Sequence, residues 1–281
     1  MRDEKGYYID DTGCLVIENG VTEIGEKAFY GCDSFTSVVI PNSVTKIDHD
    51  AFGECYSLRS VELPNSITTV GDGAFFLCEN LTSIVIPNSV TEIECFAFCC
   101  CSSLQSFVIP SGVTKLRKHT FDSCSSLRSI EIPDSVTEIE EYVFCGCDSL
   151  KSIVIPSGVT KIGEAAFSTC ESLLSIEIPD GITEIGDYFF DQCVSLTSVE
   201  IPNGITRIGD RAFTKCLSLR LVEIPSSVKE IGAWAFAGCS VLTDIRYGGT
   251  KEQWKSVKRK HYWCVNIGTN IIHCSDGDAA L

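Results

Sequence analysis

The prolines of this chain set the strongest constraint on its fold. All nine fall in one series with a constant interval of 23 residues: Pro41, Pro64, Pro87, Pro110, Pro133, Pro156, Pro179, Pro202 and Pro225. Ten cysteines, from Cys32 to Cys239, and ten phenylalanines, from Phe29 to Phe236, keep the same interval. A strict period of this length indicates one supersecondary unit that is copied and stacked. We therefore expect a solenoid of ten coils.

A single coil contains two short strands joined by turns. Residues 81–86 end in alternating, β-branched positions and predict the main strand. Pro87 ends that strand because it lacks a backbone N–H and fixes φ. Residues 90–93 predict a second strand, and residues 94–101 are too short for an independent helix, so we expect one helical or 3₁₀ turn there.

Glycine precedes this turn in six coils, which predicts a bend with unusual backbone dihedrals. The six are Gly25, Gly71, Gly163, Gly186, Gly209 and Gly232.

Seven positions per coil are apolar in nearly every copy and predict the core. In the second coil they are Val44, Ile47, Phe52, Cys55, Leu58, Val61 and Leu63, with the small Ala51 beside them. One coil buries too little to fold alone, so each must be stabilised by the coils above and below it.

A column of charged residues in the second strand supports stacking in register. Apart from Thr69, acid and base alternate from coil to coil: Glu23, Lys46, Thr69, Glu92, Lys115, Glu138, Lys161, Glu184, Arg207 and Glu230. In parallel strands about 4.8 Å apart these side chains are neighbours, and opposite charges are favoured there. We expect a ladder of ion pairs.

Three segments, LTSIVIPNSVTEI, LRSIEIPDSVTEI and LTSVEIPNGITRIGDRAFTKC, closely resemble the BspA-type leucine-rich repeats. The resemblance covers about residues 14–247. It implies a right-handed horseshoe or weakly curved leucine-rich-repeat solenoid that binds proteins or mediates adhesion, often on bacterial surfaces, without catalysis.

The two ends of the chain predict caps. Residues 1–17 form an N-terminal cap with a hairpin from Tyr7 to Ile17, residues 18–247 the solenoid, and residues 248–281 the C-terminal cap and tail. Thr250 can N-cap a helix that extends to about residue 260, with Trp254 and Val257 on one face. Residues 270–274 predict a last strand, and residues 275–281 a disordered tail.

Charge and composition narrow the classes of function. The net charge of −16 excludes nucleic acid as a partner, because phosphate binding requires a basic surface. No segment predicts membrane insertion, and the first residues lack the apolar region of a signal peptide. The sequence thus favours a cytosolic monomer unless a leader has been removed, whereas the family resemblance implies the cell surface. With four histidines, none beside a nucleophile, we expect no catalytic residue and no cofactor.

The 17 cysteines allow two interpretations. Ladder neighbours lie about 4.8 Å apart, which exceeds the roughly 3.8 Å between Cβ atoms of a disulfide, so we expect the periodic cysteines to be buried thiols that act as small hydrophobes. The additional cysteines keep a metal-binding or redox-responsive protein as the alternative function, although no metal-ligand set is predicted. They are Cys95, Cys99, Cys100 and Cys145, with Cys264 and Cys274 beside histidines of the cap, where a disulfide or a metal remains open.

The main strand predicts the binding surface. Ile84 and Ile86 point inward, so Ser83 and Val85 lie on the concave face. The column of Val85 is mostly valine in its first part and glutamate in its last three coils: Val39, Glu62, Val85, Val108, Glu131, Val154, Glu177, Glu200 and Glu223. The flanking Arg59, Arg128, Lys151 and Arg220 are expected to neutralise the acids in part. Exposed valines in a row resemble an interaction patch, and we expect a protein or another macromolecule, such as one on a host or cell surface, as the partner.

A second candidate surface is the column before the Ala-Phe pair. It includes the aromatic residues Phe96, His119, Tyr142, Tyr188 and Trp234. Aromatic residues at the edge of a repeat favour recognition. They can equally be half-buried residues that cover the phenylalanine column, and the sequence leaves both interpretations open.

Overall fold

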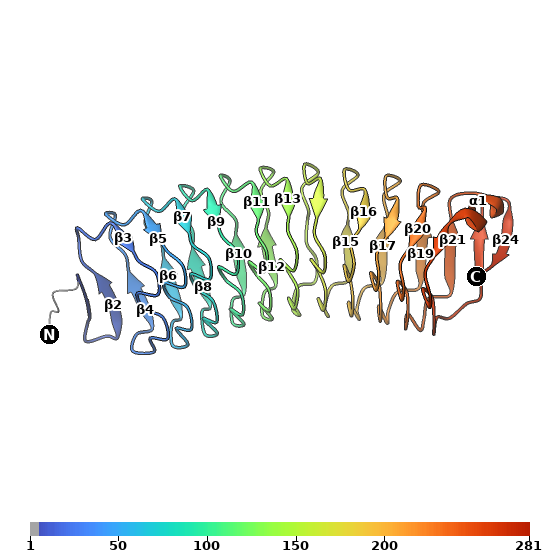
Figure 1. Ribbon diagram of the computed structural model, residues 1–281. Coiled ribbons are helices and arrows are strands. Elements are labelled where there is room, and N and C mark those ends of the chain that lie inside the picture. The colour runs from blue at the N-terminus through green and yellow to red at the C-terminus, as the bar shows by residue number, and fades with distance from the viewer. Residues whose placement is uncertain (1–5) are drawn as a thin grey trace. The chain divides into compact units, whose positions relative to one another are not determined.

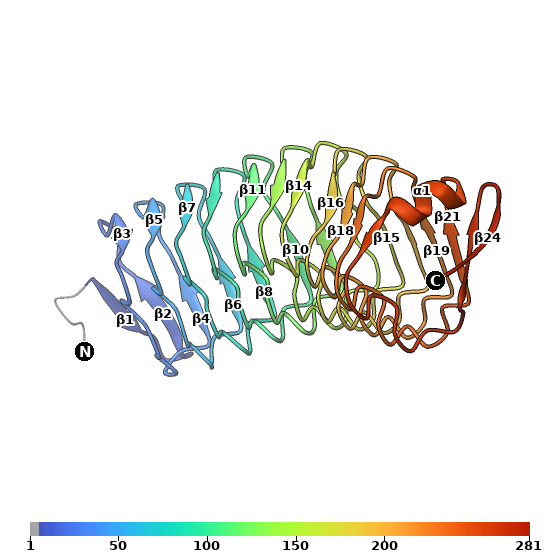
Figure 2. The same ribbon diagram turned by 45° about the vertical axis from the view of Figure 1, so that its right-hand side comes forward.

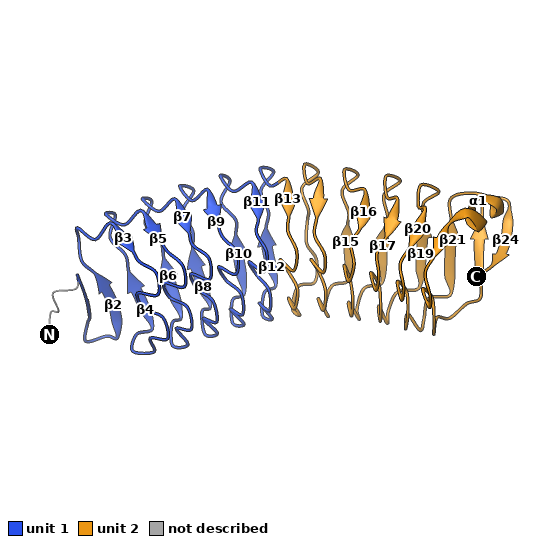
Figure 3. Ribbon diagram, in the orientation of Figure 1, with its two compact units in different colours: residues 1–136 blue, residues 137–281 orange. Residues whose placement is uncertain are grey.

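A computed structural model describes residues 6–281 of the chain. The chain divides into two compact units, Met1–Val136 and Thr137–Leu281 (Figure 3). Residues 1–5 of the predicted N-terminal cap lie outside the described residues. Each unit is a stack of parallel coils, and each coil contributes a main strand and a two-residue strand that lie in separate rows (Figures 1 and 2).

From residue 6 onward, unit 1 contains one antiparallel pair of strands, and its other strands are parallel. The hairpin joins β1 (Tyr7–Ile9) to β2 (Cys14–Ile17) with Tyr7 opposite Ile17, as the sequence predicted. The main strands are β4 (Ser37–Val39), β6 (Ser60–Glu62), β8 (Ser83–Val85), β10 (Ser106–Val108) and β12 (Ser129–Glu131). The two-residue strands are β3 (Glu23–Ile24), β5 (Lys46–Ile47), β7 (Thr69–Val70), β9 (Glu92–Ile93) and β11 (Lys115–Leu116).

Unit 2 repeats this arrangement and ends in an additional turn. Its main strands are β15 (Ser175–Glu177), β17 (Ser198–Glu200), β19 (Leu221–Ile224), β21 (Asp244–Tyr247) and β23 (Ile271–Cys274). Its two-residue strands are β13 (Glu138–Ile139), β14 (Lys161–Ile162), β16 (Glu184–Ile185), β18 (Arg207–Ile208), β20 (Glu230–Ile231) and β22 (Lys258–Arg259).

Outside the two caps, neighbouring strands pair with a constant offset of one repeat, whereas β22 and β23 of the C-terminal cap are offset by 28 and 27 residues from their partners. Val61 lies opposite Val38 and Ile84 in unit 1, and Ile176 lies opposite Val199 in unit 2. The seven apolar positions of the second coil, and Ala51, are all buried. The identical register therefore places equivalent residues of successive coils in continuous files, as the period predicted.

The phenylalanine files are the clearest result of this register. In unit 1 the rings from Phe29 to Phe121 stack coil on coil with centroids 5.3–5.6 Å apart. In unit 2 the rings from Phe144 to Phe236 follow at 5.0–5.9 Å. Rings at this distance gain energy beyond their buried area. The file thus holds neighbouring coils together along the core.

The predicted helical turn is wrong: the segment before the cysteine is a series of β-turns. Backbone N–H groups alternate between two acceptors, so that Phe29 donates to Ala51 of the next coil whereas Tyr30 donates to Lys27 of its own coil. A helix would direct every N–H along its own axis, so the alternation excludes one. The turns satisfy the backbone by joining coils.

The glycine interpretation is also wrong, because none of the six glycines has a left-handed φ. The left-handed residues occur two positions later in the coil, at Lys27, Asp50, Gly73 and their equivalents. Gly163 is instead required by close packing, since a Cβ there would lie 2.5 Å from the backbone N of Glu141. Gly71, Gly209 and Gly232 face similar contacts at 2.4–2.8 Å.

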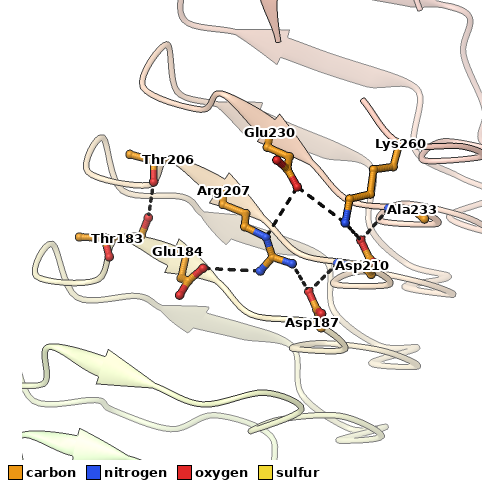
Figure 4. A network of polar contacts seen from close by, with 9 residues as sticks. All are labelled: Thr183, Glu184, Asp187, Thr206, Arg207, Asp210, Glu230, Ala233 and Lys260. Atoms are coloured by element: carbon orange, nitrogen blue, oxygen red, sulfur yellow. Dashed lines mark hydrogen bonds and ion pairs between the residues drawn. The ribbon is translucent and has the colours of Figure 1, made fainter. Parts of the chain in front are cut away.

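The predicted charge ladder forms at several steps. Lys46 contacts Glu23 at 3.8 Å in unit 1, and Lys161 contacts Glu138 at 2.6 Å in unit 2. Arg207 lies between Glu184 and Glu230, at 3.5 and 4.0 Å, and also contacts Asp187 (Figure 4).

The C-terminal cap differs from its prediction at two places. Thr250 caps helix α1 through a capping box, but α1 (Lys251–Ser256) ends earlier than expected because Lys258–Arg259 pairs as β22 with β20. Lys260 then contacts Asp210 at 3.0 Å and Glu230 at 3.7 Å (Figure 4). The tail predicted to be disordered instead contains β24 (Gly277–Ala280), antiparallel to β23. The cap is thus an eleventh turn, lengthened by α1.

Candidate functional site

The solvent-exposed side of the main strands, which we call the strand face, carries the predicted column. Alternation along each strand buries the central residue and exposes its two neighbours, as for Ser83, Ile84 and Val85. Ile86 was also predicted to point inward, but its side chain is only half-buried. All nine predicted column residues, from Val39 to Glu223, are exposed.

In unit 1 the column is mainly apolar. Val39, Val85 and Val108 are 54%, 58% and 60% exposed, large fractions for aliphatic side chains. Glu62 lies in register between Val39 and Val85, and Glu131 lies opposite Val108. The strand face of this unit therefore presents valines interrupted by single carboxylates.

In unit 2 the column becomes acidic. Val154 is 82% exposed, and Glu177 lies opposite Glu200 on the neighbouring strand. The flanking cations were expected to neutralise the acids of the column in part, but they do not. Within residues 6–281 no ion pair is made by Arg59 and Arg128 of unit 1 or by Lys151 and Arg220 of unit 2.

The sequence reasoning missed Arg246, which follows Glu223 in the same file. Its Nη1 donates to Glu223 Oε1 at 3.0 Å, and its Nη2 and Nε donate to Asp244 at 2.7 and 3.2 Å. Hydrogen bonds to Asp244 and Glu223 raise the pKa of Arg246. The last proline of the series is Pro225, so the predicted column stopped at Glu223, although the same 23-residue interval leads from Glu223 to Arg246.

Two hollows open on the strand face of unit 2. The larger is about 720 Å³ and is lined by Glu200, Glu223 and Arg246 among others, and the smaller, about 600 Å³, by Val154, Glu177 and Glu200. The larger lies where β17 and β19 belong to separate sheets, and the smaller lies where residues 152–154 form no assigned strand beside β15. Interruptions of the ladder thus coincide with the space available for a ligand.

The second predicted column consists of residues in the left-handed region. Phe96, His119, Tyr142, Tyr188 and Trp234 have φ of 56–61°. In unit 1 Phe96 stacks on His119 with ring centroids 4.6 Å apart. In unit 2 the ring of Trp234 is tilted by 34° against that of Tyr262, with centroids 4.8 Å apart. These contacts leave Phe96 and Trp234 partly exposed, at 37% and 39%. These side chains cover the edge of the coils, and binding of a partner at this second column stays a prediction.

The periodic cysteines do more than fill space. Most of these thiols donate to the carbonyl of the phenylalanine of the preceding coil, for example Cys55 Sγ to Phe29 O and Cys78 Sγ to Phe52 O, both at 3.1 Å. Cys32 is only half-buried because the first coil has no preceding phenylalanine. The hydrogen bond explains the choice of cysteine over another small apolar residue, which the sequence reasoning did not foresee.

The structure gives little support to the alternative function as a metal-binding or redox-responsive protein. None of the 17 cysteines, all of which lie within residues 6–281, forms a disulfide. Burial raises the pKa of Cys55 to about 12 and of Cys264 to about 11, which disfavours the thiolate that metals and oxidants require. Within residues 6–281 no group of three or more histidine, cysteine or carboxylate residues is placed to hold a metal ion. In the same part of the chain, no helix has the length and apolar character needed to cross a bilayer.

Comparison with known proteins identifies the family. The model of the BspA type leucine-rich repeat region matches residues 22–151 and 114–243, so this chain belongs to the BspA-type leucine-rich repeat family. No curated protein sequence matches the chain significantly.

Solved structures are similar over nearly the whole chain. A leucine-rich cell surface protein of Faecalibacterium prausnitzii is 29% identical with a TM-score of 0.53, covering 92% of this chain and 97% of its own. A leucine-rich repeat protein of Eubacterium ventriosum is 22% identical with a TM-score of 0.59, covering 93% and 92%. The pneumococcal vaccine antigen PcpA is 20% identical with a TM-score of 0.65, covering 96% and 71%. The last two support the fold alone.

Proposed function

We propose that this chain is a non-catalytic, monomeric repeat scaffold that binds a protein or another macromolecule on its strand face. The observation that carries the proposal is the exposure of all nine column residues, eight of them on main strands that follow one another at the 23-residue interval. Rigid strands hold these side chains in fixed positions, so little conformational entropy is lost when a partner binds. Exposed valines that recur along one face, at Val39, Val85, Val108 and Val154, are typical of a surface that contacts a protein partner.

The family and its neighbours support a scaffold rather than an enzyme. Leucine-rich repeats stack into extended surfaces that are used for binding. The F. prausnitzii protein is described as a cell surface protein, which supports an adhesin-like role at a surface as one form of the proposal. An interaction module in another compartment is the other form.

Position-specific photo-crosslinking tests the strand face directly. A photoreactive amino acid is placed at Val85 or Val108, both exposed on the strand face, or at Glu171, which is exposed outside the column. We expect adducts with a defined partner from the strand-face positions and not from Glu171. Equal labelling at all three positions, or none at Val85 and Val108 while Glu171 labels, would contradict the proposed surface.

A further inference from the structure

We propose that the acidic half of the strand face, formed by Glu177, Glu200 and Glu223 with the two adjoining hollows, binds an extended peptide segment rich in arginine. The inference rests on the proposed function and specifies the chemistry of its partner. Four observations support it. The guanidinium of Arg246 is already bound in this file, and in the described part of the chain the carboxylates of Glu177 and Glu200 beside it have no cation. Two hollows adjoin these carboxylates, and the net charge of the chain is negative.

The chain itself shows how a guanidinium binds to this file. Arg246 continues the column, and its side chain reaches Glu223 on the neighbouring strand at 3.0 Å. The same guanidinium is held by Asp244 through two further hydrogen bonds. One of these hydrogen bonds spans the strand spacing to a glutamate of the file, whereas the other two are made to Asp244, two residues earlier on the same strand as Arg246. The planar guanidinium makes these contacts together, which the single ammonium group of lysine does not.

The next two positions of the file present the same carboxylates without a cation. Glu177 and Glu200 lie in register on β15 and β17, and within residues 6–281 neither makes an ion pair or a side-chain hydrogen bond. Like charges opposite each other on neighbouring strands destabilise a sheet. A cation supplied by a partner relieves that repulsion, as Arg246 does for Glu223.

Space and further polar groups surround the unpaired carboxylates. Asp180, Glu200 and Pro202 line both hollows, and Ser175 and Ser198 add hydroxyls beside the glutamates. Volumes of about 600 and 720 Å³ lie within the usual range for side-chain or ligand pockets. The net charge of −16 attracts a cationic segment at a distance as well.

A labelled model peptide tests the inference without knowledge of the natural partner. The probe is a fluorescein-labelled Gly-Arg-Ser-Arg-Ser-Arg-Gly peptide, and its control carries citrulline, which keeps the shape but not the charge, in place of each arginine. Fluorescence anisotropy with the full chain at low salt is expected to show binding of the arginine peptide only. A lysine peptide of equal charge is expected to bind more weakly, because it lacks the planar donor set.

Three variants locate the site. The double variant Glu177→Gln/Glu200→Gln is expected to weaken binding about tenfold, since each exposed ion pair changes an equilibrium by roughly two- to fivefold. The control Glu62→Gln removes a glutamate of the same column that lies between valines, and should leave affinity unchanged. Arg246→Gln releases Glu223 and should strengthen binding severalfold.

The inference is overturned if the citrulline peptide binds equally well, or if the double variant and Glu62→Gln behave alike. Weaker peptide binding by Arg246→Gln would also overturn it, because the guanidinium would then assist rather than compete. Failure of the peptide while crosslinks from Val85 and Val108 persist would reject the arginine-rich partner and leave the proposed function intact.

Discussion

Substitution of Gly163 by alanine should force two coils of unit 2 apart. The added Cβ would lie 2.5 Å from Glu141 N, 2.6 Å from Glu140 C and 2.8 Å from Glu141 Cα. All three are backbone atoms, so no side chain can rotate away. Gly163 has no left-handed φ, which means that steric contact with the preceding coil, and not the backbone conformation, opposes alanine.

The magnitude follows from two opposing effects. Overpacking of this kind costs about 1–3 kcal/mol, whereas the lower entropy of the unfolded chain with alanine returns about 0.4–1 kcal/mol. A net loss of about 1–2 kcal/mol corresponds to a decrease in Tm of roughly 2–8 °C for a chain of this size. The hydrogen bond from Gly163 N to Ile139 O, at 2.8 Å, should also weaken.

Gly186 in the next coil is the matched control. Its added Cβ would meet Glu164 Cα at 3.5 Å, an ordinary contact, so Gly186→Ala should leave Tm unchanged or raise it slightly. Thermal unfolding by circular dichroism, with hydrogen exchange at residue 163, measures both variants. Equal Tm values for the two variants would refute the argument that close coil spacing selects glycine at position 163.

The remaining predictions concern the thiols and the cap. Burial raises the pKa of Cys55 from 9.0 to about 12, so an unfolded chain releases this proton above pH 9 while the native chain keeps it. The free energy of unfolding should therefore fall between pH 9 and 12, by up to about 1.4 kcal/mol per pH unit for one thiol. In Cys55→Ser it should fall less steeply with pH. Identical pH slopes of the unfolding free energy in the two proteins would contradict this. Lys260→Met should increase hydrogen exchange in β22 because it removes contacts with Asp210 and Glu230, whereas Lys258→Met should not. Thr250→Ala should destabilise the cap by about 1 kcal/mol. The measurement is the loss of native tryptophan fluorescence in urea, in a background where Trp234 and Trp263 are phenylalanine so that Trp254 alone reports. An unchanged midpoint would argue against the capping box.

The sequence predicted those features that depend on period and alternation. A 23-residue interval determines which residues become neighbours, so the phenylalanine files, the burial of Val44 or Leu58, and the exposure of Val85 all followed from it. Alternation along a strand similarly assigned every residue of the candidate column to one face. These predictions required no knowledge of exact distances.

Features that depend on backbone direction or close contact were not predictable in the same way. A turn and a short helix share residue preferences, and only the alternating acceptors of Phe29 and Tyr30 distinguish them. Gly163 is required because the backbone of the preceding coil lies close to it, and not because of its φ. The sequence shows a glycine in both cases and does not distinguish them. Arg246 was missed because the proline interval ends at Pro225 although the parallel register continues to β21. β24 was missed because it pairs antiparallel with β23 and lies outside the repeat.

Ring-to-ring NOEs between phenylalanines test the stacking in register most directly. With phenylalanine-selective protonation in a deuterated chain, we expect cross-peaks between Phe52 and Phe75 and between Phe75 and Phe98, whose centroids are 5.4 and 5.6 Å apart. Phe52 and Phe98 lie two coils apart and should show none, and Phe75→Leu should remove both observed peaks. Absence of the two cross-peaks, or a direct peak between Phe52 and Phe98, would contradict the stacking of these coils one repeat apart.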